Sequence, residues 1–272
     1  MKLHELHQKA LTEGWAVPHF NFSSLAQLNG IVDAAKKLNA PVLVGTSEGE
    51  RKHVGLKQAV ALVKSFRDEG LHIFLNADHT HSIEAAMAAF DAGYDSIHID
   101  LSKLPFQENV DGTKKIVEYV KSKNPDVEVE AELGYLVTDS SKIYNEVIEI
   151  PEDSYTKVDE AVRFVEQTHI DRFAPAVGNM HGIALNDKVI RFELIEQLRK
   201  ALPQDLTFTI HGGSGIHDED IKRMVQMGFN NAHISTELRQ AYTLALRKSL
   251  NENPDELSPQ VYEAPARAAA EA

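Results

Sequence analysis

The segment Thr207-Phe208-Thr209-Ile210-His211-Gly212-Gly213-Ser214-Gly215 decides how the rest of the chain is interpreted. Its first four residues are β-prone, so they predict a strand that ends at an imidazole. Glycines follow at once, and a glycine-rich backbone can close around an anion. The segment therefore predicts a strand whose C-terminal end carries a candidate metal ligand beside a candidate phosphate cradle.

The same order of strand, loop and helix recurs along the chain. Short apolar runs predict strands, and most are followed by an amphipathic segment of helix length. The other predicted strands cover residues 15–22, 41–47, 72–79, 96–100, 127–133, 173–177 and 232–236. Helices are expected from Ser24 to about residue 37 and over about 56–69, 84–91, 108–122 and 237–250. Eight alternations predict an α/β protein of one domain, a closed (β/α)8 TIM barrel over residues 1–250, rather than an open sheet.

Two segments interrupt this rhythm. Residues 134–155 form a long polar stretch where a short loop is expected. Long loops in compact domains are usually lids or binding loops, so this one is predicted to cover the site. The tail, residues 251–272, is rich in Ala, Glu and Pro and is either a final helix or a frayed end.

Composition narrows the classes of partner. The 272 residues carry a net charge of −13, which argues against nucleic acid and anionic membrane, because both attract basic surfaces. No cysteine is present, so disulfides and thiolate metal ligands are excluded. The first residues lack the apolar core of a signal peptide, and no stretch is apolar enough to span a membrane. We expect a cytoplasmic protein that acts on a small molecule.

Three histidines follow different predicted strands. His79 ends the third predicted strand, His181 follows the sixth and His211 ends the seventh, and these strand ends converge on one mouth of a barrel. Three protein ligands with an open fourth position are typical of catalytic zinc. Asp100 and Glu132, at the ends of the fourth and fifth strands, either bind the metal in an alternative position or orient the imidazoles.

The loops after the seventh and eighth strands predict the phosphate site. Barrel enzymes commonly bind phosphate with these loops and a nearby helix N-terminus. Here the loops supply residues 211–215 and Ser235-Thr236-Glu237, with the last predicted helix following directly. Backbone amides can hold a phosphate even on an acidic protein.

Six strings together carry a resemblance that extends from residues 17–21 to the last predicted helix. They are Asn76-Ala77-Asp78-His79, Ile99-Asp100-Leu101-Ser102, Glu130-Ala131-Glu132-Leu133-Gly134, Gly178-Asn179-Met180-His181-Gly182, His211-Gly212-Gly213-Ser214-Gly215 and Ser235-Thr236-Glu237-Leu238. In this order they resemble the class II, zinc-dependent ketose-bisphosphate aldolases, which include fructose-bisphosphate and tagatose-bisphosphate aldolases.

The resemblance implies a site and a reaction. It implies that His79, His181 and His211 bind zinc, that Asp78 carries the proton, and that Asp100 and Glu132 serve an alternative or second metal position. It implies substrate and phosphate contacts at Asn21, Ser47, Gly182, Gly212, Gly213, Ser214, His233, Ser235 and Thr236. The implied reaction is reversible cleavage of a ketose 1,6-bisphosphate, with fructose 1,6-bisphosphate expected, to dihydroxyacetone phosphate and an aldehyde phosphate through a zinc-stabilised enediolate. A second metal or a monovalent cation, and a homodimer or homotetramer, also fit the resemblance.

The chain departs from the family pattern at three places. His233 stands where relatives usually have the Asn that holds the triose. The segment after Gly134 lacks a Gly-Gly-x-Glu motif, so Asp139, Glu146 or Glu149 is left as a substitute acid. The tail is shorter than in many relatives. His98, His81 and His217 are expected to be structural, and Glu128 and Glu130 are expected inside the barrel.

Two alternative functions remain open at this stage. A non-catalytic phosphosugar-binding barrel would fit His233 and the altered lid, and a zinc hydrolase would use the pair His79 and His81. A Schiff-base aldolase is disfavoured because no lysine lies in a predicted strand.

Overall fold

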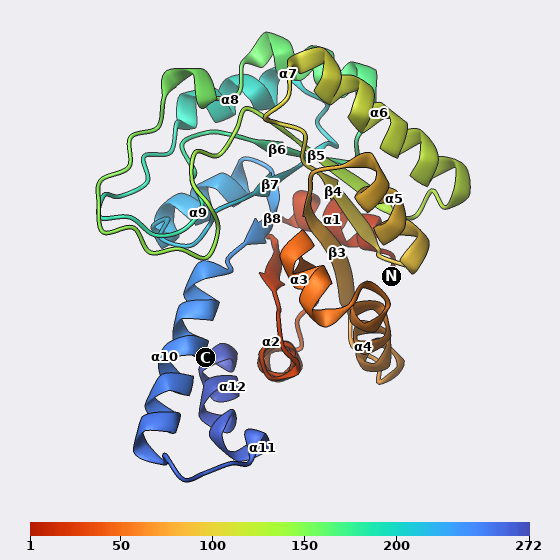
Figure 1. Cartoon of the computed structure of the whole chain (residues 1–272). Helices are drawn as coiled ribbons and strands as arrows, with labels where there is room; N and C mark the ends of the chain where they lie inside the picture. Colours follow the sequence, from red (N-terminus) through yellow and green to blue (C-terminus); the bar gives the residue numbers. More distant parts are fainter.

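Eight parallel strands close into a barrel in the computed structural model, which describes all 272 residues (Figure 1). The strands are β1 (Val17–Asn21), β2 (Val42–Thr46), β3 (Ile73–Thr80), β4 (Ser96–Ile99), β5 (Glu128–Leu133), β6 (Arg172–Pro175), β7 (Thr207–Ile210) and β8 (Phe229–His233). The predicted (β/α)8 barrel is confirmed. The predicted bounds of the eighth strand were wrong by three residues, because α10 starts at Thr236 and leaves no room for a strand there.

Helices surround the barrel on the outside (Figure 1). They are α1 (Leu3–Glu13), α2 (Leu25–Leu38), α3 (Glu48–Val54), α4 (Leu56–Asp68), α5 (Ile83–Ala92), α6 (Phe106–Lys123), α7 (Val158–Thr168), α8 (Phe192–Ala201), α9 (Asp218–Gln226), α10 (Thr236–Glu252), α11 (Pro259–Tyr262) and α12 (Ala264–Glu271). The short helix α3 was not predicted. It begins with a capping box, in which Ser47 accepts from the Glu50 amide and the Glu50 carboxylate accepts from the Ser47 amide.

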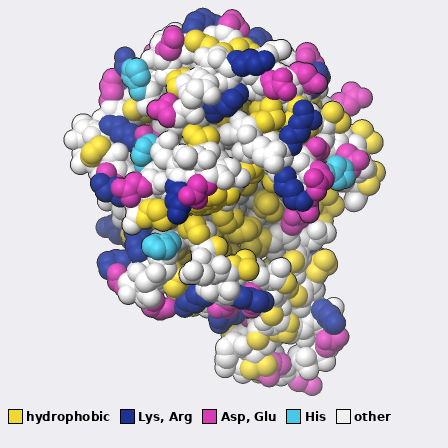
Figure 2. All heavy atoms as spheres, turned by 180° about the vertical axis from the view of Figure 1, so that it is seen from behind, with side chains coloured by type: hydrophobic (Ala, Val, Ile, Leu, Met, Phe, Trp, Pro, Cys, Tyr) yellow, Lys and Arg dark blue, Asp and Glu magenta, His cyan; other side chains and the backbone are white.

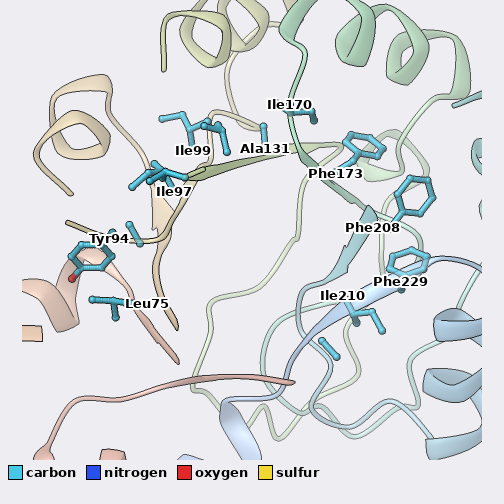
Figure 3. Close-up of a cluster of buried hydrophobic side chains, with 14 of the residues drawn as sticks. Leu75, Tyr94, Ile97, Ile99, Ala131, Ile170, Phe173, Phe208, Ile210 and Phe229 are labelled. Carbon is cyan, nitrogen blue, oxygen red and sulfur yellow. The ribbon is translucent and has the colours of Figure 1, made fainter. Parts of the chain in front are cut away.

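The main hydrophobic core lies between the strands and the helices. Alternate strand residues point outward, so Ile97 and Ile99 of β4 and the phenylalanines of β6 to β8 face the helical layer (Figure 3). Phe173, Phe208 and Phe229 follow one another edge to face, with ring centroids 5.8 and 5.3 Å apart. This layer fixes the strand register, and the register sets which side chains point into the barrel.

The barrel interior has an apolar floor and polar upper layers. Helix α1 closes the floor with Leu3, Leu6 and Ala10, which pack on the inward-facing residues Val17, Leu43 and Phe74. Above this plug, the inward positions are polar and buried: they include His19, Asn76, His98, Glu128, Glu130, Arg172, Thr209 and Asn231. The usual filling of such barrels is branched and apolar, so this polar filling marks the interior as part of the site.

The C-terminal helices form an arm beside the barrel. Helix α10 runs away from the mouth, and α12 folds back to pack between α10 and α2 (Figure 1). Arg267 pairs with Asp33 of α2 at 2.6 Å, so the tail is a final helix and not a frayed end. Hydrophobic side chains gather in a hollow between the barrel and the arm (Figure 2), where an apolar groove is lined by residues of β1, α2, β2, α10 and α12.

None of the helices is both long enough and apolar enough to cross a membrane.

Candidate functional site

A cavity without hydrophobic lining opens at the C-terminal ends of the strands. Its walls are Asn21, Asp78, His79, Ser140, His181, His211, Gly212, Ser214, His233, Ser235, Thr236 and Arg239. Most of the residues that the sequence predicted therefore meet at one mouth, although they come from five different strand ends. A fully polar lining suits a ligand rich in hydroxyl and phosphate oxygens.

A β-bulge places two consecutive residues in this cavity. Side chains in a regular strand alternate between faces, so Asp78 and His79 should point in opposite directions. The pairing of β3 with β4 shifts register between Ala77 and Thr80, and His79 has a φ of +39°, in the left-handed region. Such a backbone costs of order 1 kcal/mol or more. The surrounding structure maintains it, and both side chains line the cavity.

Asp78 is buried but remains ionised. Its Oδ2 accepts a hydrogen bond from Asn21 Nδ2 at 2.9 Å, and its Oδ1 lies 3.4 Å from His233 Nδ1. Burial alone would raise the pKa of Asp78, but the charge of His79 and the nearby imidazoles of His233 and His98 outweigh burial and hold the pKa well below its usual range. Asp78 is therefore a base that can accept a proton.

The three predicted metal ligands line the same cavity as this carboxylate, with His79 between the other two rings. The His79 ring lies 4.8 Å from the His181 ring and 4.6 Å from the His211 ring, measured between centroids. Each ring has one nitrogen facing an acceptor: Asp100 Oδ2 at 2.8 Å from His79 Nδ1, the Thr138 carbonyl at 3.3 Å from His181 Nδ1, and Glu130 Oε1 at 2.6 Å from His211 Nε2. With one nitrogen held as a donor, the other keeps the lone pair that a metal needs.

The electrostatics of the cluster favour a cation. Burial lowers the pKa of His181 and of His211 to about 3, so both rings are neutral, as a ligand must be. Burial would also lower the pKa of His79, but the carboxylates of Asp78 and Asp100 raise it to about 10. The carboxylates thus favour positive charge at this point, whether it is carried by a proton or by a metal.

A second set of groups lies beside the first. Donor atoms of His79, His98, Asp100 and Glu132 lie within 4.8 Å of one another, and so do those of Asp78, His79, His98 and His211. The buried atoms His98 Nε2 and Glu132 Oε2 have no hydrogen-bond partner. Burial and the nearby Asp100 raise the pKa of Glu132 well above its usual value. Unpartnered buried donors of these types fit a metal ion, with Asp100 and Glu132 at a second position. His98 was predicted to lie in the interior, and it is fully buried there.

A buried ion network supports His211 from below. Glu130 bonds His211 through Oε1, and its Oε2 accepts from Arg172 Nη2 at 2.7 Å. Arg172 Nη1 also pairs with Glu128 at 2.7 Å, and Glu128 lies 2.8 Å from His7 Nδ1 of α1. The chain of contacts runs from the floor of the barrel to a predicted metal ligand. The sequence placed both glutamates in the interior but gave no partner for them.

The anion side of the cavity is built from backbone and hydroxyl groups. Helix α10 begins at Thr236, so its first N–H groups have no partner within the helix, and Ser235 and Thr236 face the cavity. Gly212 and Ser214 line the same part of the cavity, where Ser214 Oγ accepts a hydrogen bond from the Glu237 amide of α10 at 3.2 Å. Gly212 has a φ of +61° and approaches the Met180 carbonyl so closely that a β-carbon would not fit.

Three predicted substrate contacts lie outside the cavity lining. Ser47 caps α3, and the Gly213 amide donates to the His233 carbonyl at 2.9 Å. Gly182 packs against the Lys142 carbonyl of the long loop. Their assignment to substrate binding remains a prediction.

The long loop covers one side of the mouth. Tyr144 donates to the Ile183 carbonyl at 2.8 Å, and Ser140 lines the cavity. Asp139, one of the three candidate lid acids, is exposed and pairs with Lys142 at 2.6 Å. None of the three acids lines the cavity.

Sequence reasoning missed two residues beside Asn21. Arg239 lines the cavity and pairs with the buried carboxylate of Glu50, which also accepts from Asn21 Nδ2 at 2.9 Å. Arg239 lies one turn into α10, after the Ser-Thr pair that begins the helix, and this position in the sequence could have indicated that it faces the cavity. The capping-box spacing of Glu50 from Ser47 was a weaker indication of where Glu50 lies.

Comparison with known proteins assigns the chain to a family. Its residues 1–272 match the model described as "Fructose-bisphosphate aldolase class-II", and the chain belongs to this family of metal-dependent aldolases. It is 34% identical to a probable fructose-bisphosphate aldolase of Bacillus subtilis over 97% of this chain and 91% of the relative. It is 33% identical to the fructose-bisphosphate aldolase of Geobacillus stearothermophilus over 100% of this chain and 93% of the relative. The crystal structure of the YdjI aldolase from Escherichia coli K12 superimposes with a TM-score of 0.81 at 28% identity, covering 99% of this chain and 92% of the other.

Proposed function

We propose that this aldolase cleaves fructose 1,6-bisphosphate reversibly to dihydroxyacetone phosphate and an aldehyde phosphate. The observation that carries the proposal is an ionised, buried Asp78 beside three converging imidazoles in a wholly polar cavity. The printed names of the relatives from Bacillus and Geobacillus support the choice of sugar.

Asp78 performs the proton transfer in this proposal. In cleavage, its carboxylate takes the proton of the C4 hydroxyl, the C4 oxygen becomes the aldehyde carbonyl, and the C3–C4 bond breaks. The electron pair of that bond passes toward the C2 carbonyl, and C3 later accepts a proton to give dihydroxyacetone phosphate. Asn21, bonded to Asp78 Oδ2, holds the carboxylate in position for this step.

Zinc is the proposed cofactor, because the donor set of neutral imidazoles with oriented second nitrogens fits it. His79, His181 and His211 would hold the ion, with Asp100 and Glu132 available for a second position. Zinc would supply Lewis acidity toward the ketone oxygen.

The phosphate of the triose half is proposed to bind at the start of α10. Ser235, Thr236, Gly212 and Ser214 line that wall, where Thr236 and Ser214 offer hydroxyl donors and the backbone offers amides, while the Ser235 hydroxyl donates to Asn21 Oδ1 at 2.8 Å. His233 is positioned to contact the substrate, and burial lowers its pKa to about 3, so it acts as a neutral hydrogen-bonding group.

Two coarser expectations complete the proposal. We propose a homodimer or homotetramer, supported by the apolar groove between the barrel and the arm, and light scattering on the purified protein would measure its mass. We also propose that the protein works in the cytoplasm.

The test is cleavage of fructose 1,6-bisphosphate and tagatose 1,6-bisphosphate before chelation, after chelation and after zinc is restored. Asp78→Asn should lower kcat by about 10²- to 10⁴-fold while zinc binding persists. The matched control is Asp159→Asn on the exposed surface of α7, which should behave as wild type.

Several results would change the proposal. Cleavage of tagatose 1,6-bisphosphate alone would reassign the substrate. Tight phosphosugar binding without turnover of either sugar would favour the non-catalytic barrel. Zinc-dependent ester hydrolysis in place of cleavage would favour the hydrolase, although the side chain of His81 is 59% exposed and does not line the cavity.

A further inference from the structure

Lys188 is a buried cation that the proposed reaction does not use. It lies in the loop between β6 and α8 and is only 4% exposed. Its ammonium donates to three backbone carbonyls, those of Met180 at 2.6 Å, Gly212 at 2.7 Å and Ser214 at 2.5 Å. All three N–H groups of the ammonium are therefore used.

The surroundings of this ammonium are unusual for a lysine. Buried lysines are normally paired with a carboxylate, but no Asp or Glu lies within ion-pair distance of Lys188 Nζ. Three carbonyl oxygens at short distance are the surroundings that proteins offer to a bare monovalent cation such as K⁺. Burial lowers the pKa of Lys188 to about 8, which leaves the ammonium mostly charged at pH 7.

The three carbonyls belong to the two loops that build the site. Met180 directly precedes His181, and Gly212 directly follows His211. Ser214 belongs to the glycine-rich loop and, with Gly212, lines the cavity. The Lys188 ammonium thus binds the backbone next to two predicted metal ligands, His181 and His211, and it also binds the backbone of the predicted phosphate-binding loop.

The same contacts bear on anion binding. Each carbonyl that turns toward the ammonium fixes the orientation of its peptide plane, and the amides that follow Gly212 and Ser214 donate to the His233 carbonyl and to Glu237 Oε1, both at 2.9 Å, which fixes the path of the loop. The ammonium also places a positive charge beside the anion wall of a chain whose net charge is −13.

We propose that Lys188 is a positioning residue whose tethered ammonium occupies a monovalent-cation position between the two loops, so that the glycine-rich loop is ordered for phosphate without a free K⁺ or Na⁺ ion. The inference rests on the proposed function only in taking phosphate as the anion.

The test uses the full-length, zinc-treated protein and the variants Lys188→Ala and Lys188→Met. Binding of inorganic phosphate is measured by calorimetry, and the unfolding temperature is measured in parallel. Each is recorded in tetramethylammonium, sodium, potassium and ammonium chloride at equal ionic strength. Lys222→Met is the control, because Lys222 is exposed on α9 and pairs only with Glu219.

We expect wild type and Lys222→Met to be indifferent to the choice of cation. Lys188→Ala should bind phosphate at least about tenfold more weakly in tetramethylammonium chloride, because the charge that orders the loop is lost. Ammonium or potassium should restore both its phosphate affinity and its unfolding temperature. Lys188→Met should be weakened and not restored, since its side chain fills the position without charge.

The proposal is overturned if wild type itself needs K⁺, or if Lys188→Ala binds phosphate within twofold of wild type. Equal failure of every cation to restore Lys188→Ala also overturns it, because the lysine would then act through packing. Should Lys188→Ala not fold in tetramethylammonium chloride, Lys188→Gln retains two N–H donors without charge and is subjected to the same comparison. None of these measurements depends on sugar cleavage, so failure of this proposal can be distinguished from failure of the proposed aldolase reaction.

Discussion

Replacing Arg172 by methionine should destabilise the barrel and weaken zinc binding together. The Arg172 side chain is fully buried and is the shared partner of two carboxylates, with contacts of 2.7 Å to Glu128 and 2.7 Å to Glu130. It also donates to Ser96 Oγ at 2.8 Å. Methionine fills much of the space but leaves Glu128 and Glu130 without the cation that they share.

The size of the effect follows from this environment. Breaking a buried ion pair by removing one partner lowers the free energy of unfolding by about 3–5 kcal/mol. Because Arg172 serves two carboxylates, the upper half of that range applies. At about 2–4 °C per kcal/mol for a chain of this length, the unfolding temperature should fall by about 8–20 °C. Zinc affinity should fall by about 10- to 100-fold, as for loss of other groups that orient a ligand, since Glu130 holds His211.

The assay is thermal unfolding by circular dichroism, with zinc titration by calorimetry on the same samples. Arg163→Met is the matched control, because Arg163 is exposed on α7 and lies 4.0 Å from Asp159; it should cost at most about 1 kcal/mol. Adding Glu128→Gln to Arg172→Met should recover part of the lost stability by removing one unpaired charge. If Arg172→Met unfolds within about 2 °C of Arg163→Met and binds zinc normally, the ion network does not support the site as argued.

Three shorter predictions follow from other contacts. Gly212→Ala should lower stability by more than about 1 kcal/mol and weaken phosphate binding, because φ is +61° and the β-carbon would collide with the Met180 carbonyl. Thermal unfolding and phosphate calorimetry on the purified variant measure the two effects, and wild-type values in both would contradict the prediction. Burial lowers the pKa of His7. Below the ordinary pKa of about 6.5, the unfolded chain therefore binds a proton that the folded chain does not bind, and stability falls as the pH drops. His7→Gln should reduce this loss of stability between pH 7 and pH 5, measured by unfolding at each pH, and an unchanged slope would show that His7 does not contribute. Removing zinc with a chelator should lower the unfolding temperature, and adding zinc back should restore it. The free energy of unfolding should rise by about 4 kcal/mol when free zinc is a thousandfold above its Kd. An unfolding temperature that does not change with zinc would argue against the ligand set.

The fold was predictable because strand and helix alternation is a local signal. Each apolar run marked a strand, and the closed barrel followed from counting them. The end of β8 was misplaced because Ile234 continues the apolar pattern beyond His233, although the chain there already turns into the N-cap of α10. Element ends depend on caps and turns, which apolar patterning does not report.

The site was predictable where residues at strand ends carry the chemistry, as with His79 and His211. The contact between His79 and Asp100 was foreseen as one of two alternatives, and the structure shows the orienting hydrogen bond. The bulge at His79 was not foreseeable, because it depends on how β3 pairs with β4. Lys188 was missed for a similar reason: its partners are backbone carbonyls, and a carbonyl carries no sequence signal.

The polar column inside the barrel has a consequence for how freely parts of this fold can be exchanged. In (β/α)8 enzymes the chemistry lies at the C-terminal end of the strands, and the N-terminal end serves stability. Here His7 of the first helix is linked through Glu128, Arg172 and Glu130 to His211. A graft that replaces the helix closing the bottom would therefore remove one end of the network that holds His211 at the opposite end.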